Sequence, residues 1–303
     1  MTSPFGPLVL IANPNAGRGT VDKALPGIES VLTEANLSYR IVRTTHPGHA
    51  TEAARQAMRD GERYLVAVGG DGTVHEVVNG MVENGGPVAA DAVLGVVAAG
   101  SGCDFVRSFG LPPDAEQAAA RLAGDLVRPI DVGTVTCADG NTRCFVNIAE
   151  VGLGAAVVAK AAGLGRFLGG ARYAAGFWLT LPRFRPAAVR LDANGQYRAW
   201  RAFNVVVANC RFYGGGMQIS PNSDPGDCLL DVLVMTGPKS DSFTTLPKVY
   251  KGAHLPHRNI AELRAAQLSI EAEPCFQVEA DGELLGTTPA SFGLIPGALR
   301  LKV

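Results

Sequence analysis

The sequence has few of the features that mark secreted, zinc-binding or nucleic-acid-binding proteins. Its six cysteines are scattered along 303 residues, and no two of them form a Cys-x-x-Cys pair. This spacing argues against a disulfide framework or a zinc site and favours reduced thiols in a cytosol. The formal net charge is only −1, which argues against a strongly basic protein that binds nucleic acid.

Long hydrophobic runs are also absent from the sequence. No uninterrupted apolar run reaches the roughly 18 residues of a membrane-spanning helix, and residues 1–4 lack the basic segment that begins a signal peptide. Hydrophobic residues make up 47% of the chain and charged residues 18%, which is typical of a globular protein with a substantial core. We therefore expect a cytoplasmic protein with no transmembrane segment, and roughly two domains of about 150 residues each.

A glycine-rich turn at residues 69–73, with the sequence Gly-Gly-Asp-Gly-Thr, is the most informative stretch of the chain. The apolar run at 64–68 before it predicts a buried parallel strand, and apolar residues at helical spacing over 74–82 predict an amphipathic helix after it. Thr73 and Glu76 match a Thr-x-x-Glu capping box, so we expect Thr73 to be the N-cap of that helix. The turn therefore joins the carboxyl end of a strand to the amino end of a helix.

This turn has the chemistry of a phosphate site. Backbone N–H groups at the start of a helix point outward and the helix dipole favours an anion, while glycines let the backbone approach it closely. A carboxylate repels phosphate unless a cation lies between them, so we interpret Asp71 as a contact to a Mg²⁺-bound nucleotide, direct or through water. The alternative is a tight turn whose glycines only supply positive φ angles and whose Asp71 forms an Asx-turn.

Three other turns follow strands predicted near 8–12, 39–44 and 92–97. The first, at 13–19, is glycine-rich but is no Walker A loop, because no Lys-Ser/Thr follows it; the next helix contains Pro26, which should delay or kink it. Thr44 ends the second strand, where ligands gather in open α/β sheets. After the third strand, the Ser101 hydroxyl suits a phosphate or ribose. Asp104 is a second acidic residue near the expected nucleotide; the alternative is that it only caps a short helix beginning at Phe105.

The order of these elements predicts two domains of different class. Four strand-then-helix units up to about residue 125 predict an α/β domain with a parallel sheet covered by helices. From about residue 129, short strands separated by Gly, Pro, Asp and Asn predict an antiparallel β-sandwich. Helical material is expected at 154–185, where arginines flank aromatic residues; this stretch either lies on an anionic membrane surface or packs on the sandwich with its arginines in solvent.

Five segments together resemble the motifs of bacterial diacylglycerol kinase-like lipid kinases, which are related to sphingosine and ceramide kinases and more distantly to NAD kinases. The segments follow the family's order and are 13–17, 69–80, 100–107, 213–231 and 281–283. Cys103 departs from the pattern, because the family has Asn there, a stronger hydrogen-bond donor. The resemblance implies a nucleotide-binding catalytic domain at 1–128, a β-sandwich lipid-substrate domain at 129–293, and a last strand at about 294–303 that returns to the first domain.

The resemblance also implies ATP and Mg²⁺ as cofactors. The nucleotide would lie across the glycine-rich turns, and the residues implied to bind it are Asn13, Pro14, Asn15, Ala16, Gly17, Thr44, Gly69, Gly70, Asp71, Gly72, Thr73, Val74, His75, Ser101 and Asp104.

The Asp-Gly-Glu segment at 281–283 resembles the element that supplies the family's catalytic carboxylates. Its general base corresponds to Glu283, with Asp281 in the supporting network; the sequence alone does not decide which of them takes the proton, because their surroundings set their pKa values. The alternative is an ordinary hairpin, since Asp-Gly is a favoured type I′ turn.

The segment at 213–231 resembles a stretch that holds a structural Mg²⁺ in bacterial members. Its ligands there would be the Asp227 carboxylate and the carbonyls of Asp224 and Leu229, with waters completing the shell; oxygen ligands of this kind suit Mg²⁺. Cys228 stands where the family has Gly, so its side chain requires a strained or different backbone. Solvated turn carboxylates are the alternative.

The function that these resemblances imply is an ATP-dependent lipid kinase that phosphorylates the hydroxyl of diacylglycerol or a similar lipid alcohol. Its partner would be a lipid substrate at a membrane surface, which implies peripheral membrane association; no nucleic-acid partner is expected, and a homodimer is left open. Two alternatives remain. One is an NAD kinase, although its Asn-Glu pair is not found and only Asn147 and Glu150 come near it; the other is an inactive nucleotide- or lipid-binding member of the same fold.

Overall fold

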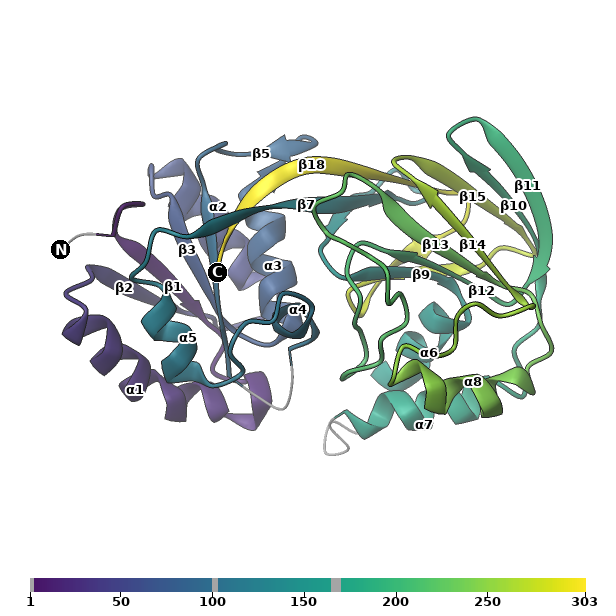
Figure 1. Cartoon of the computed structure of the whole chain (residues 1–303), viewed down its shortest axis with the longest axis horizontal. Helices are drawn as coiled ribbons and strands as arrows, with labels where there is room; N and C mark the ends of the chain where they lie inside the picture. The colour runs from purple at the N-terminus through teal and green to yellow at the C-terminus, as the bar shows by residue number, and fades with distance from the viewer. Residues whose placement is uncertain (1–2, 100–102, 165–169) are drawn as a thin grey trace. The chain divides into compact units, whose positions relative to one another are not determined.

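The computed structural model describes residues 3–99, 103–164 and 170–303 (Figure 1). The chain divides into two compact units, one formed by Met1–Val132 and Ile295–Val303, the other by Gly133–Leu294. Two strands, β7 (Val127–Thr136) and β18 (Ala290–Lys302), each contain residues of both units.

The first unit is built on a parallel sheet. Its strands are β1 (Leu8–Ala12), β2 (Tyr39–Arg43), β3 (Tyr64–Gly69) and β6 (Val93–Ala98), in the order β6-β3-β1-β2, and the end of β18 pairs parallel with β6. Every residue of β1, β3 and β6 is buried, as expected for parallel strands covered on both faces. The predicted α/β domain with a parallel sheet is confirmed.

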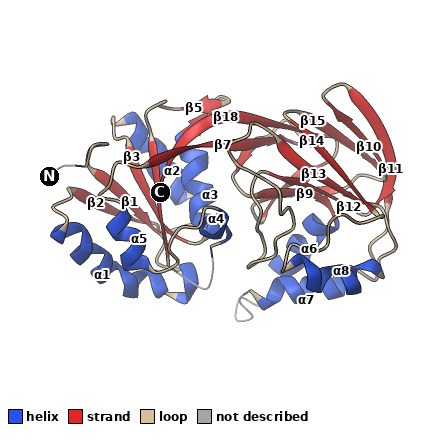
Figure 2. Ribbon diagram, viewed as in Figure 1, coloured by secondary structure: helices blue, strands red, loops and turns tan. Residues whose placement is uncertain are grey.

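Helices cover this sheet, as Figures 1 and 2 show. They are α1 (Thr20–Glu34), α2 (His49–Arg59), α3 (Asp71–Met81), α4 (Asp104–Ser108) and α5 (Ala115–Arg121), and a small hairpin of β4 (Val82–Glu83) and β5 (Gly86–Pro87) follows α3.

Pro26 does not delay α1, so the predicted delay was wrong. The helix begins at Thr20 and continues through Pro26 to Glu34. Its buried face, which includes Leu25 and Ile28, packs into the core of the unit, and this packing outweighs the hydrogen bond that proline cannot donate. Gly27 serves the packing as well, because a Cβ there would lie 2.4 Å from Oε1 of Glu116 on α5.

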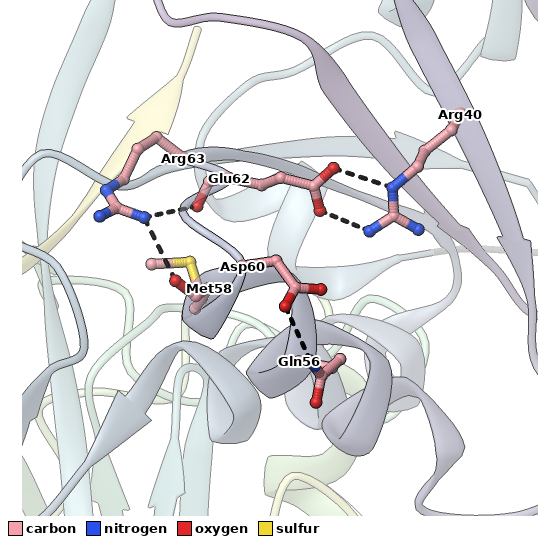
Figure 3. Close-up of polar contacts among 6 residues, drawn as sticks. All are labelled: Arg40, Gln56, Met58, Asp60, Glu62 and Arg63. Atoms are coloured by element: carbon pink, nitrogen blue, oxygen red, sulfur yellow. Dashed lines mark hydrogen bonds and ion pairs between the residues drawn. The ribbon is translucent and has the colours of Figure 1, made fainter.

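A set of polar contacts fixes the turn between α2 and β3 (Figure 3). Arg40 of β2 and Glu62 form a two-point ion pair, with Nε donating to Oε1 across 2.9 Å. Arg63 donates to the carbonyl oxygens of Met58 and Glu62. Paired guanidinium–carboxylate geometry is the form of ion pair that orients a segment best. These contacts therefore set where β3 begins, at the end opposite the glycine-rich turn.

The second unit contains two antiparallel sheets. One joins β11 (Gln196–Ala202), β10 (Ala187–Ala193), β15 (Leu268–Glu273) and β18, with β7 and β8 (Thr142–Phe145) beside them. The other has the order β14 (Ile260–Ala265), β13 (Leu230–Met235), β12 (Asn204–Ala208), β9 (Ile148–Gly152), β16 (Gln277–Ala280) and β17 (Glu283–Thr287). Inward side chains of both sheets form one buried cluster, so the predicted β-sandwich is confirmed.

Among the described residues of the second unit, the helices are α6 (Leu153–Ala162), α7 (Ala171–Thr180) and α8 (Asp241–Val249). The first two confirm the helical material expected at 154–185. The sequence did not predict β11, β14 or β17, whose residues are mostly exposed or half-buried and carry no clear apolar alternation. The last strand was expected at about 294–303, whereas β18 begins at Ala290 and is thirteen residues long, with Gly293, Pro296 and Gly297 inside it.

Candidate active site

The parallel register of the first unit brings the predicted nucleotide turns to one edge of its sheet. Ala12 lies opposite Arg43 on one side and Val68 on the other, so the residues that follow these strands are neighbours. The Thr44 N–H donates to the Ala12 carbonyl across 2.9 Å, and the Asn13 N–H to the Val68 carbonyl across 3.1 Å. The carboxyl ends of parallel strands are where open α/β sheets bind ligands.

The glycine-rich turn differs from the predicted capping box. Helix α3 begins at Asp71 with Gly70 as its N-cap, and the Thr73 N–H donates to the Gly70 carbonyl across 2.9 Å. Thr73 is therefore the third residue of the helix, not its cap. Glu76 does not close the box, since its Oε2 accepts from the Ala50 N–H of α2 across 3.0 Å. The Glu76 carboxylate thus bonds to the start of α2 and not to the N-cap of its own helix.

Neither a positive φ angle nor close packing requires glycine at positions 70 and 72 of this turn. None of Gly69, Gly70 and Gly72 has a positive φ angle, so the alternative explanation by φ was wrong. A Cβ on Gly69 would lie 2.4 Å from Oγ1 of Thr73, whereas a Cβ on Gly70 or Gly72 would meet nothing within 4 Å. Open space thus lies above Gly70 and Gly72 at the start of α3, the end of a helix whose dipole favours an anion. This is the geometry of an anion site.

The Asp71 carboxylate joins this turn to the start of α4. Its Oδ2 accepts from the Asp104 N–H across 3.0 Å, and its Oδ1 accepts from the Phe105 N–H across 2.9 Å. The Cys103 thiol also lies 3.2 Å from Oδ1. Burial, and the negative charge of Asp71, raise the pKa of Cys103 well above its usual range, so the thiol stays protonated and acts as a donor. Asp71 therefore caps a helix distant in sequence.

Asp104 does not cap α4, and that alternative was wrong. The helix begins at Asp104 itself, with Cys103 as N-cap, and the buried Asp104 carboxylate forms an ion pair with Arg107 one turn later.

Apart from Ser101, the other residues predicted to bind the nucleotide lie within α3 or in the loop that follows β1. Thr73, Val74 and His75 are buried, and the His75 ring lies beside Asn79. The first loop is folded on itself, because Asn13 Oδ1 accepts from the Asn15 N–H across 3.0 Å. The short 3₁₀ turn Ala16–Arg18 follows it, with Gly17 at φ +58°. Ser101 lies outside the described residues.

The Asp-Gly-Glu segment lies in the second unit and forms a two-residue hairpin between β16 and β17. Asp281 and Gly282 have φ angles of +49° and +87°, which match a type I′ turn. The Asp281 carboxylate accepts from the N–H groups of Val146, Asn147 and Ile148 at 2.8, 3.0 and 3.1 Å. Glu283 opens β17 and is exposed. The segment thus has the conformation of the ordinary type I′ hairpin that was the alternative prediction. Its aspartate also anchors the β8–β9 loop.

The structure describes the backbone and the side-chain contacts of the segment predicted to hold a structural metal. Cys228 adopts a φ of +63°, so it keeps the left-handed backbone for which the family uses glycine, with the strain of a side chain. Oδ1 of Asp227 accepts from the Leu229 N–H across 3.0 Å, and its Oδ2 contacts Arg264, which also pairs with Asp231. Among the residues that the structure describes, no group of three or more His, Cys, Asp or Glu side chains is placed to hold a metal ion.

Sequence analysis named Glu150 only as a near match to the NAD kinase Asn-Glu pair and did not predict that its carboxyl is buried next to the hairpin. Glu150 of β9 is only 4% exposed, and its Oε1 accepts from Nδ2 of Asn204 across 2.7 Å. Burial raises the pKa of Glu150 to about 7, against the opposing hydrogen bond from Asn204. Glu279 is opposite Glu150 in β16, and its Oε2 accepts from the Gly282 N–H across 2.8 Å. An acidic residue within the apolar run 145–151 was the signal available.

Comparison with known proteins is consistent across both units. Residues 7–135 match the diacylglycerol kinase catalytic domain, and residues 147–303 match the YegS C-terminal NAD kinase beta sandwich-like domain. A diacylglycerol kinase of Mycobacterium tuberculosis is 30% identical over 98% of this chain and 95% of its own length. A diacylglycerol kinase of Bacillus subtilis is 29% identical over 93% and 91%.

A solved structure from Bacillus anthracis, described as a candidate diacylglycerol kinase, is 26% identical and superposes with a TM-score of 0.78 over 99% of this chain and 98% of that one. An α/β unit with a glycine-rich helix start, followed by a β-sandwich, thus defines a kinase-like transferase. The chain belongs to the diacylglycerol kinase-like family of lipid kinases, which confirms the resemblance. Kinase chemistry at the family level implies the use of ATP. Of the helices that the structure describes, none is both long and apolar enough to cross a membrane.

Proposed function

We propose that this protein transfers the γ-phosphate of Mg²⁺-ATP to the hydroxyl of diacylglycerol or a similar lipid alcohol. The observation that carries the proposal is the open space above Gly70 and Gly72 at the start of α3. The amino end of a helix favours phosphate oxygens through its dipole, and membership of the lipid kinase family supports transfer to a lipid.

The proposed nucleotide site consists of the carboxyl edge of the first unit's sheet. Its residues are those at 13–17, Thr44, those at 69–75, Ser101 and Asp104. Asp71 holds the glycine-rich turn against the start of α4 through two backbone bonds, so the two helix starts keep one orientation. Mg²⁺ bound with the nucleotide would neutralise charge on the phosphates during transfer.

We assign the acceptor's proton to Glu283 and the orientation of the hairpin to Asp281. Three backbone N–H groups already occupy the Asp281 carboxylate, so its oxygens are committed to the β8–β9 loop. Glu283, two residues further on, is exposed, where a carboxylate can reach a substrate hydroxyl.

The structural Mg²⁺ belongs to the same proposal, with Asp227 and the carbonyls of Asp224 and Leu229 as its ligands. The left-handed backbone at Cys228 supports it, while the Arg264 guanidinium competes for the Asp227 carboxylate. A Mg²⁺-dependent rise in thermal stability, lost in Asp227→Asn, would support this site; the same stability with Mg²⁺ and with EDTA would oppose it.

The proposed division of labour assigns nucleotide binding and catalysis to residues 1–128 and lipid binding to residues 129–293. The proposal includes a cytoplasmic location, which the scattered cysteines favour, and peripheral membrane association, which a lipid substrate requires; the homodimer remains open.

Transfer of labelled γ-phosphate to diacylglycerol in mixed detergent micelles tests the proposal. We expect labelled phosphatidic acid with wild type and with Glu271→Gln, an exposed carboxylate on β15, and almost none with Glu283→Gln. Product from a sphingoid base alone would keep the chemistry and change the substrate.

Two alternatives have distinct outcomes in the same assay. An NAD kinase would phosphorylate NAD and no lipid. An inactive family member would bind ATP without transfer to any lipid or to NAD, and that result would overturn the proposal. Cys103 and Cys228, both departures from the family pattern, are the observations that favour the inactive member.

A further inference from the structure

Helices α7 and α8 of the second unit leave large apolar side chains in solvent. Trp178 is 42% exposed, Leu179 45%, Phe243 64% and Tyr250, directly after α8, 55%. These are four of the seven large hydrophobic side chains that the described structure leaves exposed. A single exposed apolar side chain is ordinary, but a cluster on neighbouring elements indicates an interaction surface.

The exposed residues form two stripes that meet. On α8 and its C-cap residue they lie at positions 243, 247 and 250, and on α7 at 171, 174 and 178, so each helix presents an apolar face at helical spacing to solvent. The Trp178 and Phe243 rings lie 5.1 Å apart, and α7 and α8 run beside each other in Figure 1. Lys239 fixes the pair, because its Nζ donates to the carbonyls of Leu181 and Pro182 at 3.0 and 2.9 Å.

The charge around these stripes is strongly one-sided. Residues 171–185 and 239–251 contain six Lys or Arg and one Asp, whereas the whole chain has 27 basic and 28 acidic residues. The basic side chains include Arg183, Arg185, Lys248 and Lys251, all exposed. Aromatic rings surrounded by lysine and arginine match the headgroup region of an anionic bilayer. Lysine is depleted from protein–protein interfaces, so the composition favours lipid over a protein partner.

We propose that the docking face, formed by Trp178, Leu179, Phe243 and Tyr250 with the flanking lysines and arginines, binds the surface of an anionic lipid bilayer. This inference rests on the proposed function, because membrane binding serves a kinase whose substrate is held in a membrane. It goes further by naming the surface that binds the membrane and the charge of the lipid that this surface prefers.

The position of α7 links the docking face to the candidate catalytic hairpin of the same unit. The Tyr173 hydroxyl lies beside the hairpin, 3.9 Å from where a Cβ on Gly282 would be. Trp178 is five positions after Tyr173 on α7, a rise of roughly 7.5 Å. At about 100° per residue the two side chains point about 140° apart around the helix, so seating Trp178 in the headgroup layer holds the hairpin within roughly one helix diameter of the membrane surface.

Vesicle binding by the full chain without ATP tests the docking face. We expect co-sedimentation with vesicles of phosphatidylcholine containing phosphatidylglycerol, weaker binding to pure phosphatidylcholine, and loss on raising the salt, because salt screens the lipid charge. The double variant Trp178→Ser/Phe243→Ser should bind about tenfold more weakly. The matched control is Tyr197→Ser, which removes an aromatic that is 83% exposed on β11 and should bind as wild type.

The two tryptophans of the chain permit a direct readout of insertion. In a Trp200→Phe background Trp178 is the single reporter, and we expect a blue shift and quenching by brominated lipid with anionic vesicles. Wild type that fails to bind these vesicles, or a double variant that binds equally, would overturn the docking face. Concentration-dependent self-association abolished by the double variant, without vesicle binding, would assign the face to a second copy instead.

Kinase activity in detergent micelles separates this inference from the proposed function. A double variant that keeps micellar activity and loses vesicle binding supports the docking face. Vesicle binding by a protein without transfer activity supports the face and rejects the kinase proposal. If wild type is active in micelles but does not bind vesicles, the kinase proposal is supported and the docking face is rejected.

Discussion

The Cys103 thiol donates to Oδ1 of Asp71 across 3.2 Å, and this contact joins the glycine-rich turn to the start of α4. The residues are 32 positions apart in the chain. A thiol is a weaker hydrogen-bond donor than the Asn amide that the family resemblance leads us to expect at this position. Two backbone N–H groups of α4 also donate to the Asp71 carboxylate, so the thiol is not its sole partner.

Replacing Asp71 with Ala should destabilise the protein as well as abolish transfer. Two backbone N–H groups at the start of α4 would lose their acceptor, which costs about 1–3 kcal/mol for buried donors. Asp71→Asn retains one acceptor oxygen and should lose less stability. Urea unfolding measures both variants. Unchanged stability of Asp71→Ala would show that the carboxylate does not cap α4.

Adding a single methyl group to the start of α3 should separate ligand binding from folding. Gly72 is exposed within the helix, and a Cβ there meets nothing within 4 Å. Gly72→Ala should therefore leave the free energy of unfolding unchanged or raise it by up to about 1 kcal/mol, yet weaken ATP binding about tenfold or more by filling the phosphate space. Calorimetric titration with ATP and thermal unfolding test the two effects.

Gly80→Ala is the matched control for that experiment. A Cβ on Gly80 would lie 2.5 Å from the Thr51 carbonyl oxygen of α2, so this variant should lose about 1–3 kcal/mol of stability through overpacking. Equal ATP affinity of Gly72→Ala and wild type would remove the main support for a phosphate site above α3.

The two carboxylates of the hairpin should respond differently to amide substitution. Glu283→Gln should reduce turnover by roughly 10²–10⁴-fold, the range for loss of a general base, and leave stability unchanged because Glu283 is exposed. Asp281→Asn tolerates the positive φ but replaces one acceptor oxygen by a donor facing backbone N–H groups, so stability should fall by about 1–3 kcal/mol. Stability and turnover of both variants decide the assignment.

Glu150 should make the protein less stable as the pH rises towards 7. Its pKa is raised by burial from 4.5 to about 7 in the folded state, so the folded protein holds this proton more tightly than the unfolded chain. Stability from this group is complete below about pH 4.5 and is lost as the pH rises through 7. Glu150→Gln keeps an acceptor for Asn204, and its advantage over wild type should grow by roughly 2 kcal/mol between pH 5 and pH 8.

Urea unfolding of both proteins at the two pH values measures this difference. Subtracting the variant from wild type cancels the other titrating groups. A difference that does not change with pH would mean that Glu150 titrates alike in both states.

Thiol labelling should divide the six cysteines into two groups. Cys228 and Cys275 are exposed, whereas Cys103, Cys137, Cys144 and Cys210 are buried. Burial also raises the pKa of Cys144 to about 11, and only the thiolate reacts. Ellman's reagent at pH 8 should label two thiols rapidly and the rest only on unfolding. Cys228→Ser and Cys275→Ser should each remove one rapid equivalent; rapid labelling of Cys103 would contradict its burial against Asp71.

Local sequence determined the elements whose signals are local. The strand at 64–68 and the helix after it were predictable because a buried parallel strand is continuously apolar and an amphipathic helix repeats every 3.6 residues. The α/β unit, the sandwich and the lipid kinase family followed from such segments and from the order of the motifs. The site residues that the resemblance implies remain predictions, and Ser101 lies outside the described structure.

Tertiary contact decided what depends on distant partners. Glu76 lost its capping role because the Ala50 N–H of α2 reaches its carboxylate, and Pro26 stayed within α1 because its neighbours are buried in the core. Asp71 and Asp281 became anchors through backbone groups about 33 and 134 residues away. No periodicity encodes such pairs, because a hydrogen bond depends on distance in space. The aromatic face of α7 and α8 emerged for the same reason: exposure is a property of the packed chain.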